Sequence, residues 1–186
     1  AAQRCPVGGE LLTHSAGPVA GLSGAALVGA ECGESNIVFT DMGGTSFDIG
    51  VIADGQIRTQ DFIPVIDRWR TNIPAVEVKS IGAGGGSIAW VNRDFGGALQ
   101  VGPRSAGSMP GPACYDQGGT EPTVTDADVV LGYYNPDNYL GGDLVLDPEL
   151  ARAAIQEHVA GPLGIPLLEA AWRIRRLVDA KMGQEV

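Results

Sequence analysis

The feature that most constrains the fold of this chain is a pair of glycines between two strand-forming segments, within residues 36–50. An apolar run leads to the carboxylate Asp41, and a second apolar run follows Asp48. Between the two carboxylates, Gly43 and Gly44 allow the backbone a positive φ and leave its N–H groups open to an anion. The pattern therefore predicts a strand, a tight turn and a second strand.

The side chains of this turn indicate phosphate binding. Thr45 and Ser46 add hydroxyl donors to the glycine backbone. Asp41, at the end of the first strand, is suited to hold a metal ion through water. The site is not a P-loop, because the chain has no Gly-Lys-Ser or Gly-Lys-Thr sequence. An ordinary glycine hairpin with a polar tip remains the alternative.

Length and charge limit the class of protein. The 186 residues are enough for one domain with a real core. The formal net charge of −10 disfavours partners such as nucleic acid and anionic membranes. No apolar run reaches the ~18 residues of a membrane-spanning helix, and no signal peptide is visible at the N-terminus. The three cysteines, without a Cys-x-x-Cys motif, fit a reducing, cytoplasmic compartment.

Secondary-structure signals surround the first turn. Residues 18–32 predict a helix of almost entirely small residues, which suits either close packing or the lining of a nucleotide cleft. Asp54 and Gly55 predict a two-residue hairpin turn. Further strands are expected at residues 62–66 and 75–81, with a loop at residues 68–70.

The second half begins with another glycine turn, at residues 82–87. A hairpin of residues 88–91 and 98–101 should follow, and then a long loop at residues 102–122, rich in Gly, Pro and Ser. Loops of this length are usually either functional or disordered, and we favour an ordered functional loop here. Cys114 in this loop is either a nucleophile or, as we favour, a buried packing residue.

The C-terminal part is expected to be helical. Thr125 and Asp128 match the hydroxyl-x-x-acid form of a capping box, so capping explains Asp126 and Asp128 at least as well as catalysis does. One helix should start at residues 147–149 and stop at residues 161–162. The last helix should begin near Pro166 with one apolar face.

Four motifs, taken together and in order, resemble the hydantoinase A/oxoprolinase family. They are Asp-Met-Gly-Gly-Thr-Ser-Phe-Asp at residues 41–48, Ile-Gly-Ala-Gly-Gly-Gly-Ser-Ile-Ala at 81–89, the Gly/Pro-rich segment at 101–115 and Pro-Thr-Val-Thr-Asp-Ala at 122–127. The family includes ATP-dependent 5-oxoprolinases, N-methylhydantoinases and subunits of acetone and acetophenone carboxylases.

The resemblance implies an α/β fold of the actin, sugar-kinase and ribonuclease H-like ATPase type, with a mixed sheet and flanking helices. It implies ATP and Mg²⁺ as cofactors, and residues 41–46 would form a phosphate loop. In that loop Asp41 would hold the metal, and Asp48 would organise the turn or orient water. Phosphate contacts are expected from Gly43, Gly44, Thr45, Ser46, Gly84, Gly85, Gly86 and Ser87.

The implied function is the nucleotide-binding portion of an ATP-dependent cyclic-amide hydrolase. The alternatives are part of a ketone carboxylase and a non-catalytic assembly module. The family's first phosphate loop is absent, so we expect one partial domain that acts with the rest of a longer protein or with a hydantoinase B-like subunit. Its segments are an entry and helix (1–35), a strand-rich core (36–101), a loop (102–125) and a helical part (126–186).

Overall fold

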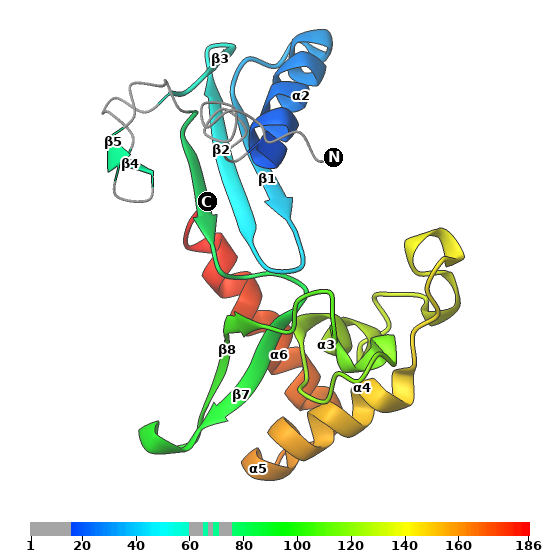
Figure 1. The fold of residues 1–186 in the computed structure, drawn as a ribbon. Coiled ribbons are helices and arrows are strands. Elements are labelled where there is room, and N and C mark those ends of the chain that lie inside the picture. Colours follow the sequence, from blue (N-terminus) through cyan, green and yellow to red (C-terminus); the bar gives the residue numbers. More distant parts are fainter. Residues whose placement is uncertain (1–15, 60–64, 67–68, 71–75) are drawn as a thin grey trace, which may run out of the picture. The chain divides into compact units, whose positions relative to one another are not determined.

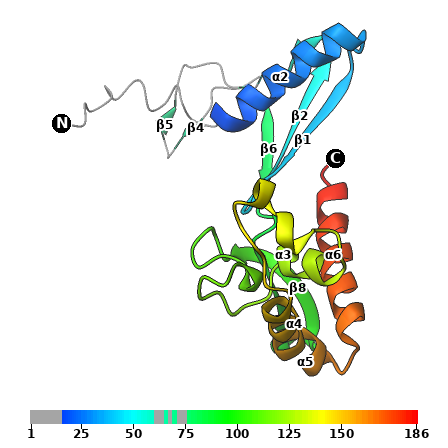
Figure 2. The same cartoon turned by 90° about the vertical axis from the view of Figure 1, so that its right-hand side faces the viewer.

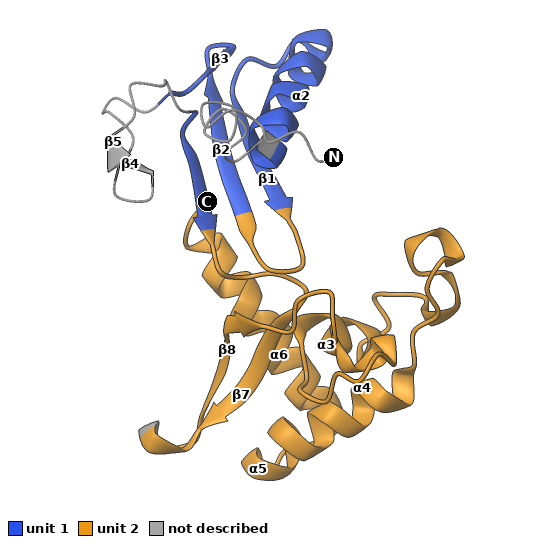
Figure 3. Cartoon of the chain, viewed as in Figure 1, with its two compact units in different colours: residues 1–41, 48–80 blue, residues 42–47, 81–186 orange. Residues whose placement is uncertain are grey.

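The computed structural model describes residues 16–59, 65–66, 69–70 and 76–186 (Figure 1). Predictions for residues 62–64, 68 and 75 lie outside the described residues. The chain divides into two compact units (Figure 3). Unit 1 comprises residues 1–41 and 48–80, and unit 2 comprises residues 42–47 and 81–186. The tip of the first glycine turn is therefore part of unit 2.

A four-stranded sheet organises the N-terminal part of the chain, in the order β1-β2-β3 with β6 paired to β2. The helix α2 (Ala16–Cys32) confirms the helix expected from the small-residue segment. The strands are β1 (Ile37–Met42), β2 (Phe47–Ala53), β3 (Gln56–Ile57) and β6 (Val78–Ile81).

Close packing explains the small residues of α2. Leu22 is fully buried, and a Cβ built on Gly50 of β2 would lie 2.9 Å from its side chain. A Cβ on Gly21 would lie 2.6 Å from the ring of Phe39 in β1. Real Cβ atoms do not approach other atoms so closely, so these glycines allow the helix to lie against the sheet.

The predicted hairpin turn is confirmed between β2 and β3. Asp54 and Gly55 have φ values of 51° and 74°, as a two-residue turn of type I′ requires. Ile52 lies opposite Ile57 in the antiparallel register. The expected loop at residues 69–70 is wrong, because β5 (Trp69–Arg70) pairs antiparallel with β4 (Val65–Ile66).

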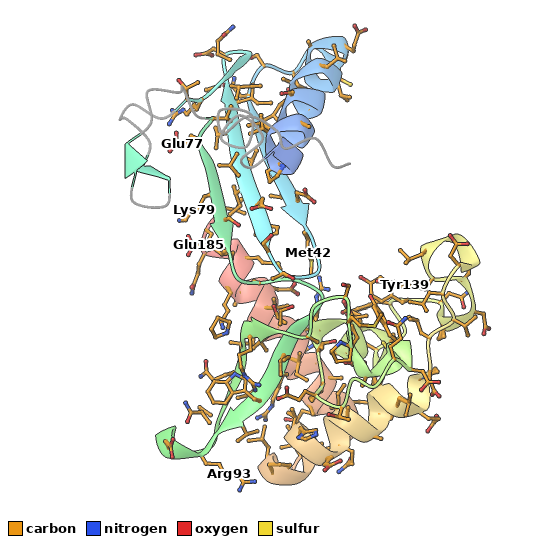
Figure 4. All side chains as sticks on the ribbon, viewed as in Figure 1. Met42, Glu77, Lys79, Arg93, Tyr139 and Glu185 are labelled. Carbon is orange, nitrogen blue, oxygen red and sulfur yellow. The ribbon has the colours of Figure 1, made fainter. Side chains whose placement is uncertain are left out.

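Unit 2 contains a long antiparallel hairpin. The strands β7 (Ser87–Asn92) and β8 (Ala98–Ser105) are joined through the short helix η1 (Arg93–Phe95). Arg93 is labelled at this turn in Figure 4. The hairpin is confirmed, but β8 continues to Ser105, into the segment expected to be loop. Pro103 is tolerated there because a two-stranded hairpin has a free edge on each strand.

Helices cover this hairpin, as Figure 2 shows for α6 beside β8. The longer ones are α3 (Val124–Val130), α4 (Pro148–Ile155) and α6 (Leu167–Gly183), and α6 also packs on α3 and α4. The shorter ones are η2 (Ala113–Tyr115), η3 (Pro136–Asn138), η4 (Leu140–Gly142), the π-helical η5 (Gln156–Ala160) and α5 (Gly161–Leu163). Among the described residues, no helix is long and apolar enough to span a membrane.

The apolar face predicted for the last helix is confirmed. Ala171, Ile174 and Val178 are fully buried, and Met182 is 8% exposed. Lys181, on the same helix, donates to the carbonyl oxygen of Val101 in β8. The buried face and this hydrogen bond together hold the last helix in place, and the hydrogen bond links it to the hairpin.

Two predicted helix boundaries differ from the structure. The capping box consists of Thr123 and Asp126, two residues before the predicted pair. The helix that starts at Pro148 does not stop at residues 161–162, because the chain remains helical until Gly164, at φ 63°. The wider turn of η5 places the carbonyl of Gln156 opposite the N–H of Gly161, which accommodates a proline at the next position.

Candidate functional site

The two glycine turns predicted from the sequence lie against each other within unit 2. The N–H of Gly85 donates to the carbonyl oxygen of Gly43 at 3.0 Å, and the N–H of Gly86 donates to that of Gly44 at 2.7 Å. A Cβ built on Gly84 would lie 2.6 Å from the oxygen of Gly43. Glycine at position 84 is therefore required for the two backbones to meet.

This pairing determines where the N–H groups of the first turn point. In a trans peptide the C=O and the following N–H point in opposite directions. Because the carbonyls of Gly43 and Gly44 face the second turn, the N–H groups of Gly44 and Thr45 face away from it. Neither has a hydrogen-bond partner among the described residues, and both residues are exposed. Two adjacent N–H groups of this kind form a small anion-binding concavity.

The N–H groups of the second turn are engaged within the protein. Gly84 donates to the hydroxyl of Ser87 at 2.9 Å, and Ser87 donates to the carbonyl of Gly84 at 3.0 Å. Gly85 and Gly86 donate to the first turn. Gly85 and Gly86 therefore support the first turn, Gly84 and Ser87 close the second turn on itself, and the contact of all four with a nucleotide stays a prediction.

A hydroxyl that the sequence did not single out lies beside the tip. Ser105, the last residue of β8, has its Oγ 3.5 Å from the Oγ1 of Thr45, and it accepts from the N–H of Gly107 at 3.1 Å. The position of Ser105 in the Gly/Pro-rich motif was the one sign in the sequence that it could belong to the site. The contact with Thr45 could not be predicted, because 60 residues separate the two. Ser46 lies in the same turn and is half-buried.

Ser105 also lines an open pocket of about 560 Å³ formed by the Gly/Pro-rich loop. Apolar side chains such as Met109 contribute one part of its wall. At its edge Arg104 donates to both carboxylate oxygens of Glu121, at 2.9 and 3.2 Å. These two lining charges neutralise each other, so the pocket suits an uncharged molecule.

The two carboxylates that flank the turn differ in exposure. Asp41 is exposed and directly precedes Met42, the last residue of β1, which is labelled in Figure 4. Asp48 is buried at 9% exposure in β2, as the structural role expects, and its catalytic role stays a prediction. Among the described residues, no group of three His, Cys, Asp or Glu side chains could hold a metal ion, and a metal at Asp41 stays a prediction.

Asp126 is a buried anchor for the Gly/Pro-rich loop. Its carboxylate accepts from the N–H groups of Ala113 and Cys114, at 3.2 and 2.8 Å. It also accepts from the N–H and the hydroxyl of Thr123, both at 2.8 Å. These bonds support the structural reading of Asp126, because its two oxygens are fully engaged.

Cys114 is fully buried, as predicted. Burial and the nearby Asp126 carboxylate raise the pKa of its thiol well above the ordinary range. A nucleophilic cysteine requires the opposite shift. The geometry therefore favours a packing role for Cys114.

Asp128 joins α3 to α6. Its carboxylate, 1% exposed, accepts two hydrogen bonds from Arg175 at 3.0 and 3.2 Å. Arg175 also pairs with Asp179 at 3.0 Å. Burial raises the pKa of the Asp128 carboxyl, and Arg175 partly offsets this rise. The arrangement is a structural ion pair, in agreement with the non-catalytic alternative.

Comparison with known proteins connects these motifs to a family. A family model described as Hydantoinase/oxoprolinase matches residues 7–186. The chain is 54% identical over 174 residues to the acetophenone carboxylase gamma subunit of Aromatoleum aromaticum. The matched region is 94% of this chain and 24% of that protein. It is 44% identical over 171 residues to caprolactamase subunit alpha of Pseudomonas jessenii, over 90% of this chain and 24% of that protein.

A solved structure agrees with these relatives. Nucleotide-free acetone carboxylase superposes with a TM-score of 0.80 at 37% identity, over 89% of this chain and 23% of that chain. The present chain thus spans about a quarter of the length of the curated relatives described above.

Proposed function

Since the chain belongs to the hydantoinase/oxoprolinase family, we propose that it forms the phosphate-binding portion of an ATP-dependent enzyme that activates a carbonyl compound. The observation that carries this proposal is the tip of the first glycine turn. Its two adjacent N–H groups belong to the exposed residues Gly44 and Thr45 and lack partners among the described residues. Backbone donors in this arrangement suit phosphate oxygens.

The residues of the turn have distinct roles in this proposal. Gly44 and Thr45 donate N–H groups to phosphate, and the hydroxyls of Thr45 and Ser46 add further donors. Asp41 holds Mg²⁺ through water, because a carboxylate in direct contact with phosphate would repel it. Bound ATP supplies a phosphoryl group, which makes a poorly reactive carbonyl oxygen a better leaving group or traps the enol form. The protein contributes position and charge stabilisation.

We extend the proposal to the fold type and to the acceptor. An actin-like and sugar-kinase-like ATPase fold is supported by the α/β units and by the likeness to acetone carboxylase. The acceptor would occupy the pocket that starts at Ser105, beside the phosphate-binding tip. The paired charges of Arg104 and Glu121 favour an uncharged ketone or cyclic amide there. The partner would be another subunit, since the relatives are named as subunits.

Two substrate classes have support. A cyclic amide agrees with the family resemblance and with the similarity to caprolactamase subunit alpha. A ketone is favoured by the higher identity, 54%, to the acetophenone carboxylase gamma subunit. Phosphate release from ATP should be measured with a lactam and, separately, with an aryl ketone, each with and without bicarbonate. Stimulation by lactam alone would identify the hydrolase, and stimulation that needs ketone and bicarbonate would identify the carboxylase.

The metal assignment predicts a specific effect at Asp41. In the active enzyme, Asp41→Asn keeps the shape of the side chain and removes its charge. We expect ATP hydrolysis to fall at least tenfold at a fixed magnesium concentration and to recover partly at high magnesium, as for a lost charged ligand. Hydrolysis should be measured across a magnesium titration, with Asp54→Asn on the exposed β2–β3 turn as the control. Wild-type rates with an unchanged magnesium dependence would remove Asp41 from the site.

A further inference from the structure

We propose that Thr125 is a positioning residue for the phosphate-binding turn, acting through two peptide groups that lie between it and the tip. This inference rests on the proposed function, since it concerns the same ligand. Thr125 lies in α3 and is only 4% exposed. It is 80 residues from the tip in sequence, and none of the phosphate-binding roles described above includes it.

Thr125 donates two hydrogen bonds to the second glycine turn. The N–H of Thr125 donates to the carbonyl oxygen of Gly85 at 2.8 Å, and its hydroxyl donates to the same oxygen at 3.0 Å. A Cβ built on Gly85 would lie 2.8 Å from that hydroxyl oxygen. Glycine at position 85 therefore allows the threonine to approach this closely.

The next hydrogen bond joins the second turn to the first turn. The carbonyl of Gly85 and the N–H of Gly86 belong to one peptide plane, and this N–H donates to the carbonyl of Gly44 at 2.7 Å. The carbonyl of Gly44 shares its own plane with the N–H of Thr45. This series of hydrogen bonds thus runs from Thr125 through two peptides to the N–H of Thr45, which faces away from the second turn.

A second series of hydrogen-bonded peptides ends at the N–H of Gly44. Ala106 donates to the carbonyl of Gly86 at 2.8 Å, and Ser87 donates to that of Gly84 at 3.0 Å. Gly85 then donates to the carbonyl of Gly43, whose peptide ends in the N–H of Gly44. Both series point their N–H ends toward the tip.

The physical effect on the tip is orientation and polarisation. Each hydrogen bond in a chain of peptides strengthens the next one, because the dipoles align. A donor at the start of the series therefore makes the last N–H a better partner for an anion and holds its plane in place. Thr125 supplies two donors to one series, and its hydroxyl can be removed without touching the backbone.

The test is ATP affinity in the active enzyme that contains this chain, measured by titration calorimetry. Thr125→Val keeps the shape and the N–H donor and removes the hydroxyl, so Gly85 retains one partner. We expect the Kd for ATP to rise about two- to threefold, because the last N–H of the series is less polarised, and the thermal midpoint of unfolding to fall by no more than a few degrees, as for one lost buried hydrogen bond. Thr125→Ser should restore wild-type affinity, and Thr59→Val, at an exposed threonine, should change neither quantity. If Thr125→Val does not fold, Thr125→Cys, a weak donor of similar size, is judged by the same criterion.

The outcomes separate this inference from the proposed function. Wild-type ATP affinity in Thr125→Val, or a loss that serine does not restore, would overturn the positioning role, while ATP binding by the wild type would still stand. A wild-type enzyme that binds no ATP would instead overturn the proposed function itself. A lower unfolding midpoint with wild-type ATP affinity would show that Thr125 only stabilises the fold.

Discussion

At the scale of single residues, Cys114 shows how burial decides chemistry. Its side chain is fully buried and its backbone N–H is bound by Asp126. The raised pKa keeps the thiol protonated at neutral pH, so it lacks the thiolate that attack on a substrate requires. A serine has nearly the same size and adds one buried hydroxyl.

We therefore expect Cys114→Ser to keep most of the activity and to lower the free energy of unfolding by about 1–2 kcal/mol. Alkylation of the native protein, mapped by mass spectrometry from pH 7 to pH 9, should modify the exposed Cys32 and spare Cys114. A loss of several orders of magnitude in activity with folding intact, or rapid alkylation of Cys114, would contradict the packing role.

Some features of single residues could be predicted from the sequence, and others could not. The turn at Asp54 and Gly55 and the burial of Cys114 were predictable, because local propensity and residue type decide them. The contact between Thr45 and Ser105 was not, since 60 residues separate the two hydroxyls. The same holds for the bonds from Gly85 and Gly86 to the first turn, which join two turns that lie about 40 residues apart in the sequence.

At the scale of elements, the ion pair of Asp128 and Arg175 holds α3 against α6. Removing the arginine leaves a buried carboxylate without its cation. Because burial raises the pKa of Asp128 above its unfolded value, the folded state binds more protons than the unfolded state as pH falls. The ionised carboxylate of Asp128 therefore destabilises the fold most at pH values above its folded pKa. This destabilisation disappears when the carboxyl is protonated.

We expect Arg175→Met to lower the free energy of unfolding at pH 7 by about 3 kcal/mol, and by clearly less near pH 4. Urea unfolding of both proteins at the two pH values measures this difference. The exposed pair of Arg152 and Glu149 is the control, since Arg152→Met should cost less than about 0.5 kcal/mol. An equal loss at both pH values would mean that packing, rather than charge, explains the effect of Arg175.

Element boundaries were predictable only in part. The start of α4 follows from Asp147, whose carboxylate accepts from the N–H groups of Glu149 and Leu150. The capping box was placed two residues late because Thr123 and Thr125 both precede an acid by three positions. The strand β8 ran past its predicted end because its pairing with β7 outweighs the local preference of a Gly/Pro-rich segment for loop.

In the molecule as a whole, the proposed phosphate-binding tip offers few groups to a nucleotide. Among the described residues it offers two N–H groups without partners, and no cluster of three metal-binding side chains is present. Two hydrogen bonds to a charged group contribute about 3–6 kcal/mol, whereas association costs about 4–15 kcal/mol.

The 186-residue chain alone should therefore bind ATP weakly or not at all. Calorimetry of the chain by itself, with and without magnesium, tests this expectation. A Kd in the micromolar range would mean that these residues contain a complete nucleotide site, and the account of the tip as one part of it would be wrong.

ATP binding by Gly44→Val in the active enzyme tests directly whether the first glycine turn binds phosphate. A Cβ at position 44 meets no atom within 4 Å, so a side chain can start there without a clash, and we expect valine to obstruct the approach to the N–H groups. We predict an unchanged unfolding midpoint and at least a tenfold rise in the Kd for ATP. Gly183→Val, where a Cβ also meets no atom within 4 Å, serves as the control and should bind like the wild type. Wild-type ATP affinity in Gly44→Val would contradict the claim and leave the turn as an ordinary glycine hairpin.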